Sequence, residues 1–430
     1  MRLSDSLTRR KQELPPPPGP IGMYFCGPTV YQRIHVGNAR PYVFSLWLRR
    51  WLHEGGYDVK LVENITDIND KIYEAAARKG IRSDELARAA TRWYVEDTDA
   101  LGLGRPDVEP LATESLPEIV ALIEDLVARG LAYESGGDVY FRVSAFPDYG
   151  VLSGADPGAM IAQEPSELKE DARDFALWKA TKPHEDTAWD SPWGRGRPGW
   201  HIECSAMAEK HLGRAFDVHG GGLDLRFPHH ENELAQSRGA GREFARTWAH
   251  NGMLRLDETK MSKSVGNVLP LRDVLERWGR EALLLFFLGA HYRNWIDFSE
   301  EAMDAAAAEA ERFRNAFREQ ERASGPSREW NDFVAVLEDD FATQKALAIL
   351  HEWRSSGRLD LLRRGLGIFG LETLVHDEEP PPELVALARS REEARARGDF
   401  GEADRIRDDI AKRGWEIRDL PNGFRLVRVR

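Results

Sequence analysis

The sequence predicts an α/β protein with a doubly wound parallel sheet, followed by a helical bundle and a small mixed module. Three features near the N-terminus predict the sheet: an apolar stretch over residues 22–26, a helical pattern over 37–52 and a second apolar stretch over 59–64. A glycine-bearing turn and a glycine pair separate them, and strand, turn, helix and strand in this order form the βαβ unit of a parallel sheet. The length of 430 residues exceeds one domain and suggests about three.

Composition narrows the class of protein. With 42% hydrophobic and 30% charged residues, the chain is expected to be globular and not disordered. Two cysteines exclude a disulfide framework, and the longest apolar stretch, residues 282–290, is too short to cross a membrane. The N-terminus lacks the apolar segment of a secretory signal, so we expect a cytoplasmic protein without membrane contact.

Charge is uneven along the chain. The net charge of −13 disfavours a protein that coats nucleic acid without specificity. The last eighteen residues are different, because they carry five arginines against Glu416 and Asp419. We therefore expect an acidic body with a basic C-terminal tip.

The middle of the chain is predicted to contain helices followed by an insertion. Helical patterns cover 68–79 and 83–101, and Ser115 with Glu118 has the spacing of a capping box before a helix that Gly130 ends. Short strands around 139–143 precede a stretch rich in glycine and proline. We interpret this part as an insertion between two halves of the sheet domain.

The C-terminal third reads as helices and a hairpin. The sequence pattern predicts helices from Ser299 onward and a proline-rich linker over 377–382. It then predicts a pair of helices over 383–413, divided near Gly398. A turn signal at residues 421–423 indicates a strand pair in the tail. The expected domains are a split sheet domain (1–111 and 199–250), the insertion (112–198), a lysine-loop region (251–298), a helical bundle (299–376) and a C-terminal module (383–430).

Two short motifs suggest a phosphate site. His35-Val-Gly-Asn38 lies at the start of the first helix, where backbone N–H groups attract anions and Gly37 permits close approach. By itself, a histidine at the start of a helix can also be a helix cap or a surface residue without a role in binding. Lys260-Met-Ser-Lys-Ser264 forms a compact cationic loop suited to a pyrophosphate leaving group, with a solvated charged turn as the alternative.

A third set of residues suggests a metal site. His229 and Glu233 are four apart, so a helix would place both on one face. With Cys26 and Cys204 they form a plausible tetrahedral zinc set, since thiolates favour zinc over harder cations. The alternative is a pair of buried, unligated cysteines with a surface His/Glu pair. We expect His230 to face elsewhere on the helix.

The motifs together resemble those of a known family. His35-Val-Gly-Asn38 and Lys260-Met-Ser-Lys-Ser264 resemble the two signatures of class I aminoacyl-tRNA synthetases, with Asn38 in place of the usual second histidine. The flanking text is similar to that of cysteinyl-tRNA synthetases in particular: Cys26-Gly-Pro-Thr-Val-Tyr31, Asn64-Ile-Thr-Asp-Ile68, Pro198-Gly-Trp-His-Ile-Glu-Cys204, Asp217-Val-His-Gly-Gly-Gly222 and residues 227–233. The resemblance covers nearly the whole chain.

The resemblance implies a Rossmann-like catalytic sheet, a connective insertion and an anticodon-binding module. It implies ATP-dependent activation of L-cysteine, with Mg²⁺, and transfer to the 3′-terminal adenosine of tRNA(Cys) by a monomer. The residues it implies are Cys26, Cys204, His229 and Glu233 for one Zn²⁺; His35, Gly37, Asn38, Lys260 and Lys263 for ATP and catalysis; Thr66, Trp200, His201, His219 and Asp224 for the cysteine pocket; and Arg413, Trp415, Arg418, Asp419 and Arg425 for tRNA.

Two other functions fit part of the pattern. One is a tRNA-independent ligase that joins cysteine to an amino sugar, against which the C-terminal module argues. The other is a non-catalytic tRNA-binding paralogue, against which His35 and the two lysines argue. Residues 339–345 differ from the sequence usual in the family, and the segment 349–369 is shorter than usual. The resemblance therefore does not predict the shape of the bundle.

Overall fold

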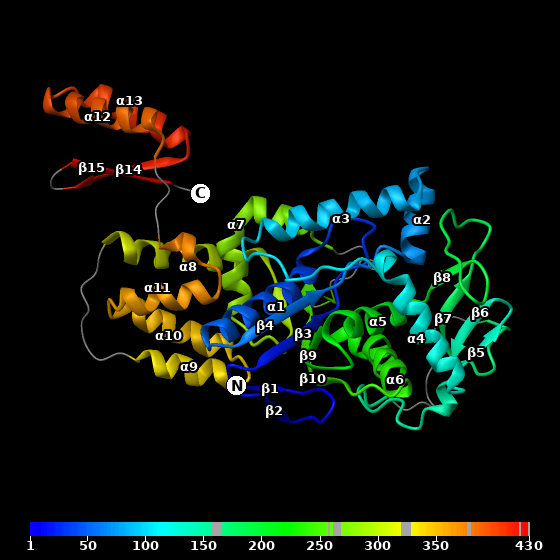
Figure 1. Cartoon of the computed structure of the whole chain (residues 1–430). Coiled ribbons are helices and arrows are strands. Elements are labelled where there is room, and N and C mark those ends of the chain that lie inside the picture. The colour runs from blue at the N-terminus through cyan, green and yellow to red at the C-terminus, as the bar shows by residue number, and fades with distance from the viewer. Residues whose placement is uncertain are drawn as a thin grey trace.

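The computed structural model describes residues 1–155, 166–256, 259–260, 268–319, 328–375, 380–420 and 423–428; of 259–260, 319 and 420 it describes the backbone alone. Among these residues, none of the helices combines the length and apolar character needed to span a bilayer. Figure 1 shows a central sheet wrapped by helices, with an inserted sheet at one end and a small module at the other.

The central sheet has the strand order β10-β9-β3-β4, and all its pairs are parallel. β3 (Pro20–Phe25) and β4 (Asp58–Glu63) come from the N-terminal part, and β9 (Ala215–Gly222) and β10 (Phe244–Asn251) come from beyond the inserted strands. The predicted βαβ unit is confirmed, because α1 (Val36–Glu54) connects β3 to β4. The parallel sheet is thus built from two separate stretches of chain.

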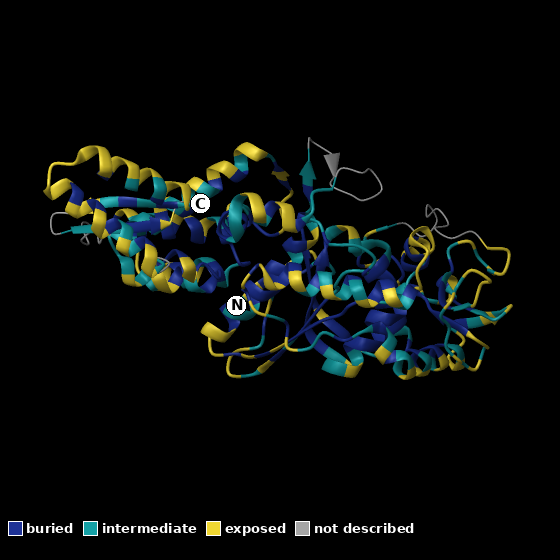
Figure 2. Cartoon of the chain, turned by 90° about the horizontal axis from the view of Figure 1, so that it is seen from above, coloured by how far each residue is buried: buried dark blue, intermediate teal, exposed yellow. Residues whose placement is uncertain are grey.

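Helices cover both faces of this sheet, as the doubly wound prediction requires. Met23 and Phe25 pack in one core with α1, whereas Tyr24, which points to the other face, packs in a second core with α5 (Trp200–Leu212) and α6 (Glu231–Gly239). This alternation is the period of two expected of a strand buried on both sides. The buried centre is visible in Figure 2.

The chain between β4 and β9 holds helices and a second sheet. α2 (Asp70–Lys79), α3 (Ser83–Asp99) and α4 (Leu116–Ala128) precede four antiparallel strands in the order β5-β6-β7-β8. These strands are β5 (Ala132–Ser135), β6 (Asp138–Phe141), β7 (Phe175–Ala180) and β8 (Gly196–Pro198).

The predicted capping box at Ser115 is wrong. A 3₁₀ turn, Ala112–Ser115, already leads into α4, and the Ser115 hydroxyl donates back to the Leu111 carbonyl instead of accepting from the helix. A residue that leads into a helix from a preceding 3₁₀ turn does not have the extended backbone conformation that an N-cap residue needs.

A small sheet follows the central one. β11 (Leu254–Leu256) pairs parallel with β13 (Ile296–Phe298) and antiparallel with β12 (Thr259–Lys260). The Lys260 backbone therefore belongs to a small sheet whose first strand follows shortly after β10. The Lys260 side chain and Lys263 lie outside the described residues.

The helical bundle packs directly on the sheet domain. Helix α7 (Leu271–Leu288) precedes the bundle, whose helices are α8 (Glu300–Glu319), α9 (Trp330–Glu338), α10 (Thr343–Ser355) and α11 (Leu359–Ile368). Phe333, Trp353 and Phe369 of the bundle belong to the same hydrophobic core as Trp47 and Trp51 of α1. The N-terminal hairpin of β1 (Arg2–Ser4) and β2 (Lys11–Glu13), which the sequence did not indicate, reaches the bundle through Asp340, which accepts from Ser4.

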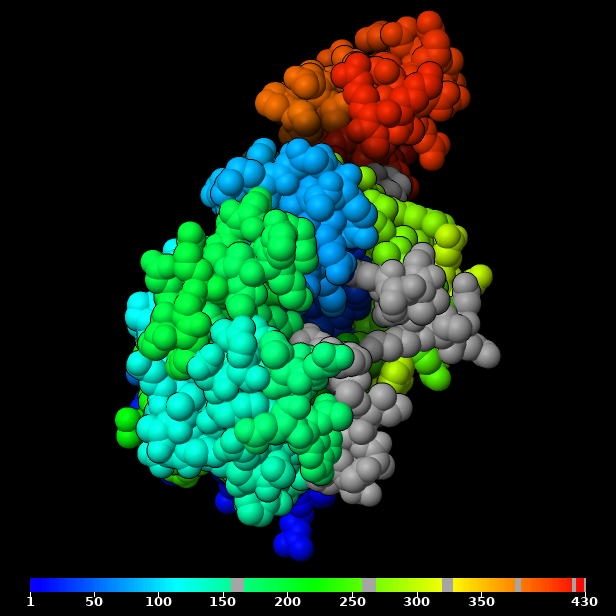
Figure 3. Space-filling model, turned by 90° about the vertical axis from the view of Figure 1, so that its right-hand side faces the viewer, coloured from blue at the N-terminus to red at the C-terminus, as the bar shows by residue number. Residues whose placement is uncertain are grey.

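The C-terminal module projects from one end of the body (Figure 3). α12 (Pro382–Ala396), α13 (Phe400–Lys412) and the antiparallel pair β14 (Trp415–Leu420) and β15 (Gly423–Arg428) confirm the predicted helix pair and hairpin. Arg418 and Arg425 join the module to α8, through the Asn315 side chain (3.3 Å) and the Arg318 carbonyl (2.9 Å).

Trp415 does not lie where base stacking would need it. Its ring is 4% exposed and is part of the core of the module, with Leu384, Ile410 and Leu426. A short amphipathic hairpin must bury its largest apolar side chain against its two helices, so the expectation of a free stacking ring at this position needs correction. Asp419 is half exposed and paired with Arg391 and Arg395.

Candidate functional site

Four ligand-forming side chains meet where the first parallel strand ends. The Sγ of Cys26, just after β3, lies 3.7 Å from the Sγ of Cys204 on α5 and 3.5 Å from the Oε1 of Glu233 on α6. The Nε2 of His229 lies 3.1 Å from the same Oε1. The four donor atoms all lie within 4.8 Å of one another, so a single cation reaches all of them.

The backbone before α6 brings His229 to this cluster. Residues Arg226–His230 form one π-helical turn, with Phe227 in a non-helical conformation, and the α-helix begins only at Glu231. The sequence predicted one continuous helix face for His229 and Glu233. The two side chains do converge, although a wider turn than an α-helical one carries the histidine.

Burial opposes charge throughout the cluster. It raises the pKa of Cys26, Cys204 and Glu233 and lowers the pKa of His229 well below its usual value. Thiolates and a carboxylate packed this closely repel one another and are costly without a compensating positive charge. Two sulfurs with one imidazole nitrogen and one carboxylate oxygen are a set that zinc accepts and that Mg²⁺ does not favour.

A second set of donors overlaps the first. Cys26 and Glu233 also lie within 4.8 Å of the ring nitrogens of His219 and His230. The expectation that His230 faces away from the cluster is therefore wrong, because the π turn rotates it inward, 4.5 Å ring to ring from His219. Its Nδ1 is 2.8 Å from the Nε2 of His250.

Neighbouring side chains hold two of the four donors, Glu233 and His229, in place. The Nε2 of His219 is 2.8 Å from the Oε2 of Glu233, and the Nδ1 of His201 is 2.9 Å from the Nδ1 of His229. The Trp200 ring stacks on His229 at 4.1 Å. Such partners orient ligands and fix histidine tautomers in metal sites.

An open cleft of about 570 Å³ runs from this cluster to the start of α1. Its walls include Cys26, Trp200, Gly222 and Asp224 together with His35, Gly37 and Asn38. Of the five residues expected in the amino-acid pocket, Trp200 and Asp224 line this cleft. Thr66 and His219 are buried behind it, where the Asn64 amide donates to Thr66, and His201 lines a neighbouring cavity.

The N-terminus of α1 opens onto the cleft. His35 is its N-cap residue, and its backbone N–H donates to the Asn38 side chain at 3.4 Å. Val36 N–H donates to the Leu269 carbonyl, and Leu271 N–H donates to the Ile34 carbonyl, both at 3.0 Å. The segment around Leu269, which follows the lysine motif in the sequence, is therefore joined to the residues just before α1.

Arg40, to which the sequence patterns assigned no role, supports the cleft wall. Its buried guanidinium donates to the carbonyls of Gly252 and Asn294, both at 2.6 Å, and of His291 at 3.0 Å. Burial lowers its pKa to about 9. Gly252 lines the cleft, so Arg40 ties the cleft wall to α1.

Known proteins resemble this chain in sequence and in fold. The family "tRNA synthetases class I (C) catalytic domain" matches residues 15–308. A solved methionyl-tRNA synthetase from Mycobacterium tuberculosis, in complex with methionyl-adenylate, has a TM-score of 0.61 at 17% identity, over 83% of this chain and 88% of that one. A LeuRS–tRNA–LeuAMS complex from Agrobacterium radiobacter has a TM-score of 0.59 at 12% identity, over 85% and 86%. The chain belongs to the class I tRNA synthetases.

Curated relatives define the family within that class. Cysteine--tRNA ligases from Brevibacillus brevis and Symbiobacterium thermophilum are each 42% identical, over 100% of this chain and 99% and 100% of theirs. The cysteinyl-tRNA ligase anticodon binding domain matches residues 377–423. The chain is a member of the cysteine--tRNA ligase family.

The role of Arg40 gives a stability prediction. Arg40→Met removes the donor from three carbonyls, two of them in buried hydrogen bonds, and we expect it to lower the free energy of unfolding by about 2–4 kcal/mol. Arg40→Lys should recover part of this loss. Urea denaturation measures both.

Arg49 on the same helix is the control. It pairs with the partly exposed Asp107 at 3.1 Å, and Arg49→Met should cost less than about 1 kcal/mol. Equal effects of Arg40→Met and Arg49→Met would contradict the role given to Arg40.

Proposed function

We propose that this chain activates L-cysteine with ATP to cysteinyl adenylate and transfers the cysteinyl group to the 3′-terminal adenosine of tRNA(Cys). The observation that carries the proposal is a thiol-rich donor cluster, of which Cys26 lines a cleft, together with a helix N-terminus that lines the same cleft. The first suits a sulfur-containing substrate, and the second suits phosphates. Membership of the cysteine--tRNA ligase family supports the same reaction.

We assign Cys26, Cys204, His229 and Glu233 as the ligands of one Zn²⁺. Bound zinc lowers the pKa of a thiol that coordinates to it, whereas a serine hydroxyl stays protonated and binds poorly. The residues around the ligands then acquire roles: His219 orients Glu233, and His201 and Trp200 orient His229. The desolvated His201 ring, with its pKa lowered to about 3, is neutral and serves as a hydrogen-bond partner.

The remaining pocket residues hold the rest of the amino acid. The exposed carboxylate of Asp224, at the rim of the cleft, is placed to bind the substrate ammonium. Thr66 acts from behind the cleft through Asn64, whose Oδ1 lies 3.6 Å from the Sγ of Cys204. The cysteine carboxylate is thereby left free to face the phosphate end of the cleft.

Activation joins that carboxylate to ATP. A carboxylate oxygen attacks the α-phosphorus, and pyrophosphate leaves. We assign His35, Asn38 and the backbone at Gly37 to the phosphates, and Lys260 and Lys263 to the charge on the leaving group, with Mg²⁺ carried by ATP. Positioning and neutralisation of charge provide most of the acceleration in such a transfer.

The C-terminal module is proposed to bind the anticodon. Arg413 and Asp419 are exposed, and Arg418 and Arg425 are partly exposed, so all four are accessible to RNA. Trp415 supports them from the core. The match of residues 377–423 to an anticodon binding domain favours tRNA over an amino-sugar acceptor. We further propose a cytoplasmic monomer with the domain boundaries given above.

Pyrophosphate exchange and tRNA charging test the proposed reaction. Purified protein with ATP and cysteine should catalyse exchange of labelled pyrophosphate into ATP, and it should charge tRNA(Cys) but not glucosaminyl-inositol. Absence of exchange would leave only a non-catalytic paralogue, and exchange without charging of tRNA would indicate a different acceptor.

One substitution in each of the two overlapping donor sets shows which set binds the metal. Cys204→Ala should lose the zinc that the purified wild-type protein carries, measured by atomic emission, and should lose discrimination of cysteine from serine in the exchange assay. His230→Asn is the matched change in the other set and should keep the zinc. The reverse result would move the metal to Cys26, His219, His230 and Glu233.

A further inference from the structure

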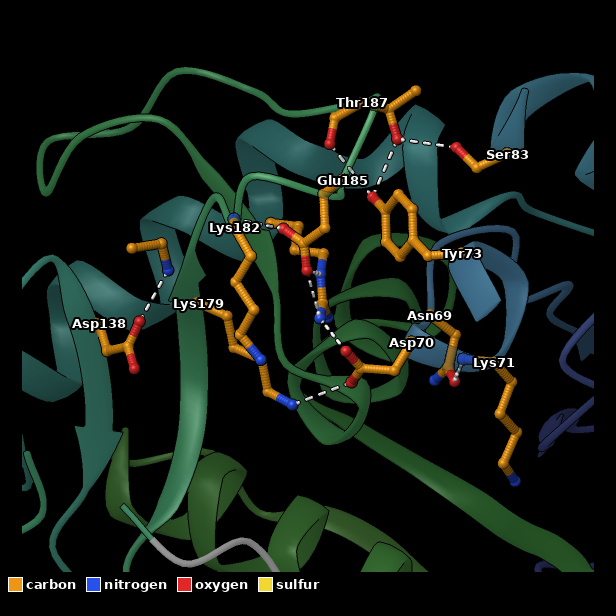
Figure 4. Close-up of polar contacts among 12 residues, drawn as sticks. Asn69, Asp70, Lys71, Tyr73, Ser83, Asp138, Lys179, Lys182, Glu185 and Thr187 are labelled. Atoms are coloured by element: carbon orange, nitrogen blue, oxygen red, sulfur yellow. Dashed lines mark hydrogen bonds and ion pairs between the residues drawn. The ribbon is translucent and has the colours of Figure 1, made fainter. Parts of the chain in front are cut away.

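Tyr24 places a buried hydroxyl beside the donor cluster. The residue is 0% exposed, and its hydroxyl oxygen has no well-aligned hydrogen-bond partner among the described residues. The hydroxyl of Tyr73, by contrast, lies 2.9 Å from the Thr187 Oγ1 (Figure 4). The hydroxyl of Tyr292 donates to the Asp340 carboxylate at 2.9 Å. A buried polar group without a partner costs free energy, and proteins keep such groups mainly where they serve a function.

The Tyr24 hydroxyl faces the donor cluster. Tyr24 precedes Cys26 by two residues at the end of β3, so both side chains lie on the face of the sheet that packs against α5 and α6. Burial raises the pKa of the Tyr24 hydroxyl well above its ordinary value, and the neighbouring Cys204, Cys26 and Glu233 raise it further, Cys204 most among them. Three of the four donors therefore lie close to this hydroxyl.

His219 occupies the matching position on the neighbouring strand. It is directly opposite Tyr24 in the parallel register of β3 and β9, and the two rings meet edge to face at 5.3 Å. The Nε2 of His219 lies 2.8 Å from the Oε2 of Glu233. One member of this cross-strand pair thus contacts the carboxylate of the cluster, and the other is placed beside the sulfur of Cys204.

The amide of Asn64 offers Cys204 no proton. Its Oδ1 accepts from the Gly27 N–H at 3.1 Å and from the Cys204 thiol at 3.6 Å, while its Nδ2 donates to the Thr66 Oγ1. An amide held in this orientation directs oxygen at the sulfur, and oxygen cannot donate to a thiolate. Of the two groups, only the Tyr24 hydroxyl can donate to an ionised Cys204.

The charge of the proposed zinc site gives such a donor its importance. Two thiolates and one carboxylate outweigh the two positive charges of zinc by one, and the thiolate of a bound cysteine adds a second negative charge. Burial makes this excess costly. A hydrogen bond to a ligand sulfur stabilises the charged form of that sulfur and withdraws part of its charge, and outer partners of this kind tune the affinity of a metal site.

We infer that the Tyr24 hydroxyl donates a hydrogen bond to the metal-bound thiolate of Cys204 and thereby favours the binding of a further thiolate, that of the substrate. Tyr24 acts through Cys204 and is a positioning residue. The inference rests on the proposed zinc site and adds a residue to it. A tyrosine hydroxyl suits this task because it keeps its proton at neutral pH and adds no charge.

Cobalt spectroscopy tests the hydrogen bond directly. Tyr24→Phe removes this hydroxyl alone, and Tyr292→Phe is the matched control because it removes a buried hydroxyl in another core. With Co²⁺ loaded in place of zinc, the absorption band for charge transfer from sulfur to metal should lie at longer wavelength in Tyr24→Phe than in wild type. A thiolate without a hydrogen bond gives up an electron more easily. Tyr292→Phe should show the wild-type spectrum.

Binding measures the same effect without catalysis. Tyr24→Phe should bind zinc at least about tenfold more weakly in competition with a chelator. The zinc-loaded variant should bind L-cysteine about tenfold more weakly in calorimetry, since a hydrogen bond to a charged group is lost. In pyrophosphate exchange its KM for cysteine should rise, while its KM for ATP should stay within about twofold of wild type.

The stability of the metal-free proteins separates this role from a structural one. In urea, metal-free Tyr24→Phe should unfold at the wild-type midpoint or above it, whereas Tyr292→Phe should unfold earlier because Asp340 loses a donor. A lower midpoint for metal-free Tyr24→Phe would make its role structural and overturn the inference. A cobalt spectrum and a zinc affinity equal to those of wild type would overturn it as well. A wild-type protein without any sulfur-to-cobalt band would instead overturn the zinc assignment itself.

Discussion

Two thiols, an imidazole and a carboxylate share a space less than 5 Å across at the end of the parallel sheet, and three of the four are fully buried. Burial opposes charge on the thiols and the carboxylate, and proximity adds repulsion once they ionise. The arrangement is favourable when a cation is bound. The rest of the site follows from this constraint, because His219, His201 and Trp200 pack around the donors and leave one open side facing the cleft.

The fold meets this constraint by close packing at two glycines. A Cβ at Gly27 would lie 1.8 Å from the Asn64 carbonyl oxygen, and one at Gly220 would lie 2.2 Å from the Phe25 ring. Both glycines therefore permit the strand ends to come together around Cys26. The same edge of the sheet receives the start of α1 and the segment around Leu269, so Cys26 of the donor cluster and the N-terminus of α1 line one cleft.

Local sequence patterns predicted the helices and strands well, and they predicted the surroundings of individual side chains less well. Alternating burial in β3, the helix after Gly37 and the hairpin near Gly423 follow from spacing and turn chemistry, which are properties of short segments. Ser115, Trp415 and His230 were misjudged because a preceding 3₁₀ turn, a small core and a π turn decide them, and none of these is visible in side-chain spacing. The surroundings of Arg40 and Tyr24 depend on segments more than 100 residues apart, so local patterns assigned these two residues no role.

The central claim is that the thiol of the substrate is recognised by a metal held by two thiolates of the chain. X-ray absorption at the zinc edge, on the zinc-loaded protein with and without L-cysteine, tests it most directly, with L-serine as the control. The account predicts two sulfur ligands from Cys26 and Cys204 in the free protein, a third after addition of cysteine and no change with serine. A sulfur count that cysteine leaves unchanged would contradict it.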